Sequence, residues 1–168
     1  MRIRVISLFA SALLLLSSCK AQSGETEVKE LLSAPAIVFT YAGTDYAYDN
    51  TSGIFTVKSG SYADSTICIS GDSAHITVGG LEADTAAATF PSLAAFAAMC
   101  TAFAGCEAND IGVTDDGRYV LAAADMRFLV TYYSEAGTAV CTVETELGIF
   151  EYSSVIPKKQ TFKTAEAR

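Results

Sequence analysis

Apolar and polar residues alternate with a period of two through most of residues 36–156, and turn signals interrupt the alternation. This pattern predicts short strands joined by tight turns, which requires mostly antiparallel pairing. Hairpin turns are expected at Gly43-Thr44, Gly71-Asp72, Asp116-Gly117 and residues 134–137, and single strands at residues 54–58 and 148–155. The sequence therefore predicts a sheet of about ten strands.

The turn positions also predict which residues face each other across each hairpin. The expected pairs are Phe39–Tyr48, Tyr41–Tyr46, Ile67–Ile76, Cys68–His75 and Val113–Val120, with Asp115 beside Arg118. The first two pairs place four aromatic rings on one face of the sheet, and Ile37 extends that row. His75 and Cys68 lie on the face opposite to Ile67 and Ile76.

One segment, "TFPSLAAFAAMCTAFAG" at residues 89–105, has no charged residue and is rich in alanine. Pro91 suits the first turn of a helix and Gly105 suits the position after its end. A helix that is apolar on every side is normally buried on every side. We therefore expect an α+β fold in which a curved, mostly antiparallel sheet, a half-barrel, wraps this buried Ala-rich helix. A membrane-inserting hairpin is the alternative, although alanine gives little insertion energy.

The N-terminus has the pattern of an export signal. Arg2 and Arg4 precede a short apolar stretch, residues 5–16, which is too short to span a bilayer. The following "LSSC" resembles the lipobox of bacterial lipoproteins, in which the cysteine is lipidated and becomes the first mature residue. The resemblance implies a lipid-anchored Cys19 and an exported protein held at a bacterial membrane. The alternative is an ordinary cleaved signal with a chance cysteine.

The rest of the chain divides into a tether, one domain and a tail. We expect a signal peptide at residues 1–18, the lipidated cysteine and tether at 19–27, a single domain at 28–156 and a polar tail at 157–168. Val28, Leu31 and Leu32 have helical spacing, and Pro35 ends that short helix. The formal net charge of −8 argues against nucleic acid as a partner, because phosphates require cationic patches.

The cysteines suggest disulfides, because an exported domain keeps an even number besides Cys19. Cys141 shares a face with Ala139 and Val143, so it is expected to point toward the helix that carries Cys100. Pairing of Cys141 with Cys100 or Cys106 is the expectation, and buried free thiols are the alternative that stays open.

The sequence gives little support for a catalytic site or a metal site. A Cys68–His75 pair has the composition of a nucleophile and its base, but its strand neighbours are those of a solvent-facing surface. The only histidine and the absence of CxxC spacing disfavour zinc. The acidic pairs Glu82/Asp84, Asp115/Asp116 and Glu144/Glu146 have the positions of ordinary surface charges. We expect no catalytic residue, no metal and no cofactor.

The aromatic row is the strongest candidate for binding. The row either packs in the core against the helix or forms one wall of an apolar cavity, with the tyrosine hydroxyls at the more solvated end. The candidate ligand-binding residues are Phe39, Tyr41, Tyr46, Tyr48, Phe96 and Phe103.

The order of features resembles the half-barrel lipoproteins and carriers of the LolA/LolB and LppX-like group. The stretches "GLEADTAAATFPSLAAFAAMCTAF" and "YYSEAGTAVCTVETELGIFEY" are similar in layout to the helix and closing hairpin of that group. The resemblance covers about residues 28–156 and concerns architecture only. It implies a concave apolar surface for a lipid or acyl chain. We therefore expect a non-enzymatic envelope lipoprotein that binds a hydrophobic ligand, with an envelope protein–protein interaction module as the alternative.

Overall fold

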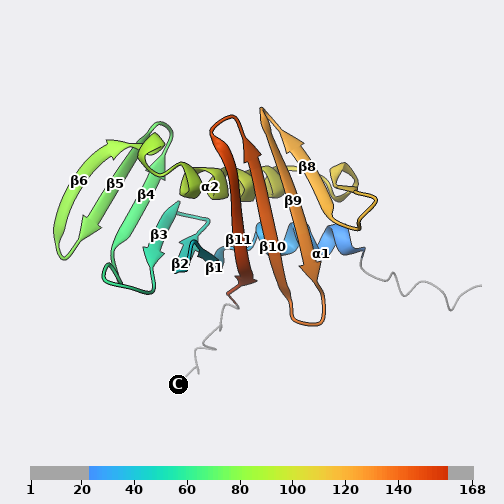
Figure 1. Cartoon of the computed structure of the whole chain (residues 1–168), viewed down its shortest axis with the longest axis horizontal. Helices are drawn as coiled ribbons and strands as arrows, with labels where there is room; N and C mark the ends of the chain where they lie inside the picture. Colours follow the sequence, from blue (N-terminus) through green and yellow to red (C-terminus); the bar gives the residue numbers. More distant parts are fainter. Residues whose placement is uncertain (1–22, 159–168) are drawn as a thin grey trace, which may run out of the picture.

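The computed structural model describes residues 23–158, which form an α+β fold. The expected signal peptide, the lipidation site Cys19 and most of the expected tail lie outside the described residues. The described part contains a large, curved and unclosed antiparallel sheet of 11 strands with two α-helices, α1 and α2 (Figure 1). The strand order across the sheet is β6-β5-β4-β3-β2-β1-β11-β10-β9-β8-β7.

The elements follow the chain in two meanders with α2 between them. The bounds are α1 Gly24–Leu32, β1 Ala36–Tyr41, β2 Thr44–Asp49, β3 Ile54–Val57, β4 Thr66–Ser70, β5 Ser73–Val78, β6 Leu81–Ala86, α2 Pro91–Gly105, β7 Gly112–Val113, β8 Tyr119–Ala123, β9 Met126–Tyr133, β10 Thr138–Thr145 and β11 Gly148–Pro157. Short 3₁₀ turns, η1 Ala87–Thr89 and η2 Ala108–Asp110, flank α2. The first strand, β1, pairs with the last strand, β11, and this pairing joins the two meanders.

A bulge in β11 helps to bend the sheet where the meanders meet. Thr40 pairs with Ser153 while Val38 pairs with Ile156, and the ladder to β10 shifts at the same place. Ser154 lies between these pairs with a φ of 52°. Because a bulge bends its strand and increases the local twist, this residue favours the curvature seen in Figure 1.

Both helices pack on one face of the sheet. Val28, Leu31 and Leu32 of α1 are buried, and so are Leu93, Phe96 and Phe103 of α2. The Lys29 ammonium group of α1 donates hydrogen bonds to the carbonyls of Phe103 and Ala104, at 3.3 and 3.1 Å. These carbonyls belong to the last turn of α2, where partners within the helix are missing. At the other end of α2, the Tyr152 hydroxyl donates to the Ser92 carbonyl at 2.5 Å.

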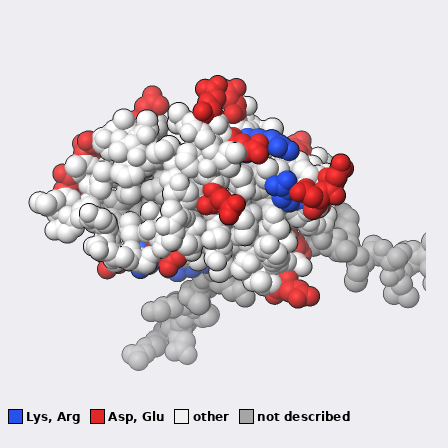
Figure 2. Space-filling view, viewed as in Figure 1, with Lys and Arg blue, Asp and Glu red and all other residues white. Residues whose placement is uncertain are grey.

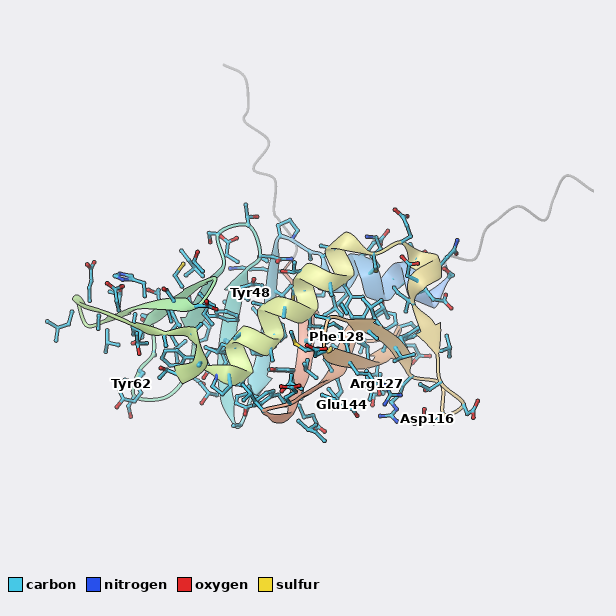
Figure 3. The ribbon with its side chains drawn as sticks, turned by 90° about the horizontal axis from the view of Figure 1, so that it is seen from above. Tyr48, Tyr62, Asp116, Arg127, Phe128 and Glu144 are labelled. Atoms are coloured by element: carbon cyan, nitrogen blue, oxygen red, sulfur yellow. The ribbon has the colours of Figure 1, made fainter. Side chains whose placement is uncertain are left out.

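The structure confirms the helix expected within residues 89–105, but this helix is not buried on every side. Thr101 and Ala104 are exposed, and Ala94, Ala97 and Ala98 are half-buried. Seen from above, no strand crosses the helix on the viewer's side (Figure 3). The sheet therefore covers one side of α2, and small side chains form the other side.

Two expected registers are wrong, and the register of the second hairpin is confirmed. Ile67 faces Ile76 and Cys68 faces His75, as expected. In the first hairpin, however, Phe39 faces Tyr46 and Ile37 faces Tyr48, because the turn is Ala42-Gly43 with φ angles of 47° and 78°. The shift is two residues, so the rings stay on the expected face.

The third hairpin differs by one residue. Val113 faces Tyr119 and Gly112 faces Val120, because the turn contains three residues, 115–117, with Gly117 at a φ of 80°. The ion pair of this turn is consequently Arg118 with Asp116, at 2.7 Å, rather than with Asp115. The expected tether is also shorter than predicted, because α1 already begins at Gly24.

Candidate functional site

Four of the six candidate ligand-binding residues are buried in the core. Phe39 stacks on Phe96 with ring centroids 3.9 Å apart, and Tyr48 stacks on Phe55 at 4.3 Å. Phe103 packs near Phe128, whose ring centroid is 6.3 Å away. These rings fill the space between α2 and the sheet. Desolvation by this burial raises the pKa of the Tyr48 phenol to about 12.

The other two candidates, Tyr41 and Tyr46, lie at the margin of this core and are only partly exposed. Tyr41 lies against Tyr152, with centroids 5.4 Å apart. Tyr46 stacks on Phe39 at 5.3 Å, and its other side lines a groove. Of the six, Tyr46 is therefore the residue that the structure places at an open apolar space.

This space, which we call the Tyr46 groove, has a volume of about 430 Å³. Its lining residues are Thr44, Tyr46, Val57, Ser59, Gly60, Ser61, Tyr62, Ser65, Ile67, Ile76, Val78 and Phe90. The groove volume lies within the usual range of small-molecule sites, about 300–1,000 Å³. Among the described residues, no charged side chain belongs to this lining.

The groove exists because α2 is shorter than the sheet is wide. Phe90 immediately precedes the first residue of the helix, and β4–β6 project beyond that end (Figure 1). Ile67 of β4 and Ile76 of β5 face each other on the helix side of the sheet, where α2 no longer covers them. The loop that precedes β4 contributes Tyr62, which is 68% exposed and forms the outer wall.

A second cavity, of about 340 Å³, lies on another side of the first turn of α2, between Pro91 and Phe150. Its lining includes the carboxylate residues Asp72, Asp125 and Glu146. These three acidic residues make the second cavity less suited to an apolar molecule than the Tyr46 groove.

Cysteines 68, 100, 106 and 141 are free thiols in the structure, so the predicted pairing of Cys141 with Cys100 or Cys106 is not present. Cys100 and Cys141 are completely buried, as expected for an inward-facing Cys141. Burial, together with the neighbouring Cys141, raises the pKa of the Cys100 thiol well above its usual value. These two cysteines pack as small apolar side chains.

His75 and Asp84 form an exposed pair that the sequence did not reveal. His75 Nδ1 lies 2.8 Å from Asp84 Oδ1, and Cys68 occupies the facing position on β4. The row Cys68–His75–Asp84 has the composition of a nucleophile, base and orienting acid, but it lies on the face opposite to the groove. Among residues 23–158, no group of three or more His, Cys, Asp or Glu residues is placed to hold a metal ion.

The His75–Asp84 pair predicts a pH effect. The hydrogen bond to Asp84 raises the pKa of His75 above its usual 6.5, so protonated His75 favours the folded state. This contribution is complete below the unfolded-state pKa and is lost as the pH rises through the folded-state pKa. We expect Asp84→Asn to lower the His75 pKa in an NMR titration of the single imidazole. Glu82→Gln, a weaker influence, is the control, and an unchanged pKa in Asp84→Asn contradicts the pairing.

Comparison with protein-family models, curated proteins and solved structures finds no match for this chain. By its fold, the chain is an α+β protein with a large unclosed antiparallel sheet. Its candidate site is a groove with an uncharged lining on the helix-bearing face of that sheet. Within residues 23–158, neither helix has the length and apolar character needed to cross a membrane.

Sequence reasoning missed most residues of the groove. The Ile67–Ile76 pair was predicted on one face, yet nothing in the sequence indicates that α2 begins too late to cover it. Tyr62 and Phe90 lie in connecting segments, whose positions depend on tertiary packing.

Proposed function

We propose that this protein is a non-enzymatic cell-envelope lipoprotein that binds a lipid or another hydrophobic small molecule in the Tyr46 groove. The groove itself supports this proposal: a concave space of about 430 Å³ with aromatic and aliphatic walls and four serine or threonine hydroxyls. Such a combination of apolar lining and few polar groups is typical of small-molecule sites.

In this proposal the curved sheet acts as a half-barrel that wraps α2, like that of the LolA/LolB and LppX-like group. The helix fills the middle of the trough, where Phe39 and Phe96 stack. The ligand then occupies the remaining part of the trough, beyond Phe90. Phe39, which stacks on Tyr46, supports the groove from behind, and Tyr46 and Tyr62 contact the ligand.

The proposed location is the outer side of a bacterial membrane, to which a lipidated Cys19 anchors the protein. The acidic surface is compatible with an anchor that depends on acyl chains rather than on charge attraction to anionic lipids. Most charged side chains in the view of Figure 2 lie over the right-hand half of the molecule, and the surface over β3–β5 is mainly uncharged.

A fluorescence titration tests the binding site. The full chain carrying Cys19→Ala, which lacks acyl chains of its own, is titrated with N-phenyl-1-naphthylamine, whose emission rises in apolar surroundings. We expect saturable binding, and we expect Ile76→Glu to weaken it by about tenfold or more, because a carboxylate then lies in the apolar floor.

Thr77→Glu is the matched control. Thr77 follows Ile76 on β5 and is not part of the groove lining, since alternate side chains of a strand point to opposite faces. We expect Thr77→Glu to bind the probe like the parent protein. Equal binding by both variants, or none by the parent, contradicts the proposal. Mass spectrometry of solvent extracts from the parent then identifies the co-purifying ligand.

The alternative is an envelope protein–protein interaction module, and the edge strand β6 favours it. This strand ends the sheet, and Leu81 at its start is 79% exposed. An edge strand offers unpaired backbone groups to which an added strand can pair. A parent protein that binds no apolar probe and yields no lipid favours this alternative.

A further inference from the structure

The polar groups of the Tyr46 groove are all of one chemical kind. Thr44, Ser59, Ser61 and Ser65 contribute hydroxyls, and Tyr46 and Tyr62 contribute phenols. The Ser59 hydroxyl oxygen accepts a hydrogen bond from the Asp45 backbone amide at 2.9 Å, which leaves its own proton free to donate. Burial raises the pKa of the Tyr46 phenol, so this group stays neutral at physiological pH. Hydroxyls of this kind pair with an alcohol, ester or ketone oxygen without requiring charge.

None of the Lys and Arg side chains of residues 23–158 lines the groove. Lys29 donates to the last-turn carbonyls of α2. Arg118 pairs with Asp116, and Arg127 pairs with Glu144 at 3.3 Å. Figure 3 shows Tyr62 at one end of the molecule and these charged pairs at the other.

Two lysines remain, and both lie on the opposite face of the sheet from the groove. Lys58 and Lys158 line a shallow depression with Ala47 and Thr56. Lys58 follows Val57, which points into the groove, so strand alternation directs the lysine to the other side. A carboxylate or phosphate in the groove therefore meets no cationic side chain of the described residues.

The surroundings of the groove disfavour an anion further. Asp64 is an exposed acidic residue that directly precedes the lining residue Ser65. The whole chain carries a formal charge of −8. An ionised carboxylate that leaves water here finds hydroxyl donors but no cation, so it recovers only part of its hydration free energy, whereas a ligand hydroxyl recovers its hydrogen bond from serine or threonine.

We propose that the Tyr46 groove selects electrically neutral apolar molecules that carry a hydroxyl, ester or ketone oxygen, and that it discriminates against fatty acids and other anionic amphiphiles. This selectivity rests on the proposed function, because it describes the ligand class of the same groove. It places the charged headgroups of phospholipids outside the set of molecules that the groove accommodates.

Displacement of N-phenyl-1-naphthylamine from the full Cys19→Ala chain tests the selectivity with two probes of equal chain length, dodecan-1-ol and dodecanoate, at pH 8. We expect dodecan-1-ol to displace the dye at a concentration about tenfold lower than dodecanoate does. An alcohol is also intrinsically more apolar than a carboxylate, and this difference alone favours dodecan-1-ol. A variant with an added cation tests whether the absence of a cation in the groove contributes to the discrimination. Ser61→Lys adds a cation at the exposed rim, and it should improve displacement by dodecanoate about fivefold relative to displacement by dodecan-1-ol.

Ser134→Lys is the matched control, since Ser134 is an exposed serine in the turn between β9 and β10. This variant has the same net charge as Ser61→Lys and should leave both displacement curves unchanged. Equal displacement by dodecanoate and dodecan-1-ol, or no effect of Ser61→Lys, overturns the selectivity while the binding function stands. A parent protein that binds neither the dye nor the alcohol overturns both.

Discussion

Replacing Phe96 with alanine is expected to lower the free energy of unfolding by about 3–5 kcal/mol, as for other buried phenylalanines. Phe96 is completely buried and lies at the centre of the aromatic cluster. It stacks on Phe39 and meets Tyr48 and Tyr152 edge to face, with centroids 5.8 and 5.0 Å away. The substitution removes these contacts and leaves a cavity that the surrounding sheet cannot easily fill.

Urea denaturation followed by circular dichroism measures this loss. Thr101→Ala is the control on the same helix, because Thr101 is exposed and bonds only to the Ala97 carbonyl among the described residues. We expect this control to change the free energy of unfolding by no more than about 0.5 kcal/mol. A similarly small change for Phe96→Ala would mean that α2 does not pack on the sheet through this ring.

Cys19→Ala is expected to abolish membrane attachment completely. If Cys19 carries the acyl chains, its removal leaves no thiol for lipid transfer at the lipobox, and the chain loses its hydrophobic anchor. Metabolic labelling with a palmitate analogue and fractionation of membranes measure the effect. We expect the label to disappear and the protein to leave the membrane fraction.

Cys68→Ala is the control for this experiment. It removes another thiol of the chain, one that lies half-buried on β4, far from the lipobox in sequence. This variant should keep both the label and the membrane attachment. Retention of the label by Cys19→Ala contradicts the lipobox interpretation and would point to an ordinary secretory signal.

Local patterns predicted much of the sheet because strand alternation and turn residues act over a few positions. The facing of Ile67 and Ile76 followed from a two-residue turn at Gly71-Asp72, and the structure confirms it. The predicted register was wrong where the turn was misplaced: the turn is at Ala42-Gly43 rather than Gly43-Thr44, and moving a turn by one position shifts every pair by two residues.

The strand β6 was missed because its residues, "LEADTA", have low strand propensity. Its formation depends on the preceding Gly79-Gly80 turn, whose φ angles of 57° and 84° bring the chain back beside β5. That glycine pair was the signal available in the sequence. The Tyr46 groove had no comparable local signal, because it depends on where α2 begins relative to strands β2 to β5.

The pairing of β1 with β11 gives the chain a particular folding problem. Each meander can form from neighbouring residues, but the seam between them needs residues 36–41 to meet residues 148–157. Closing so long a loop costs entropy before any contact offsets it, and long-range strand pairing is slow for this reason. The two meanders can therefore join into one sheet only after residues 148–157 have been synthesised.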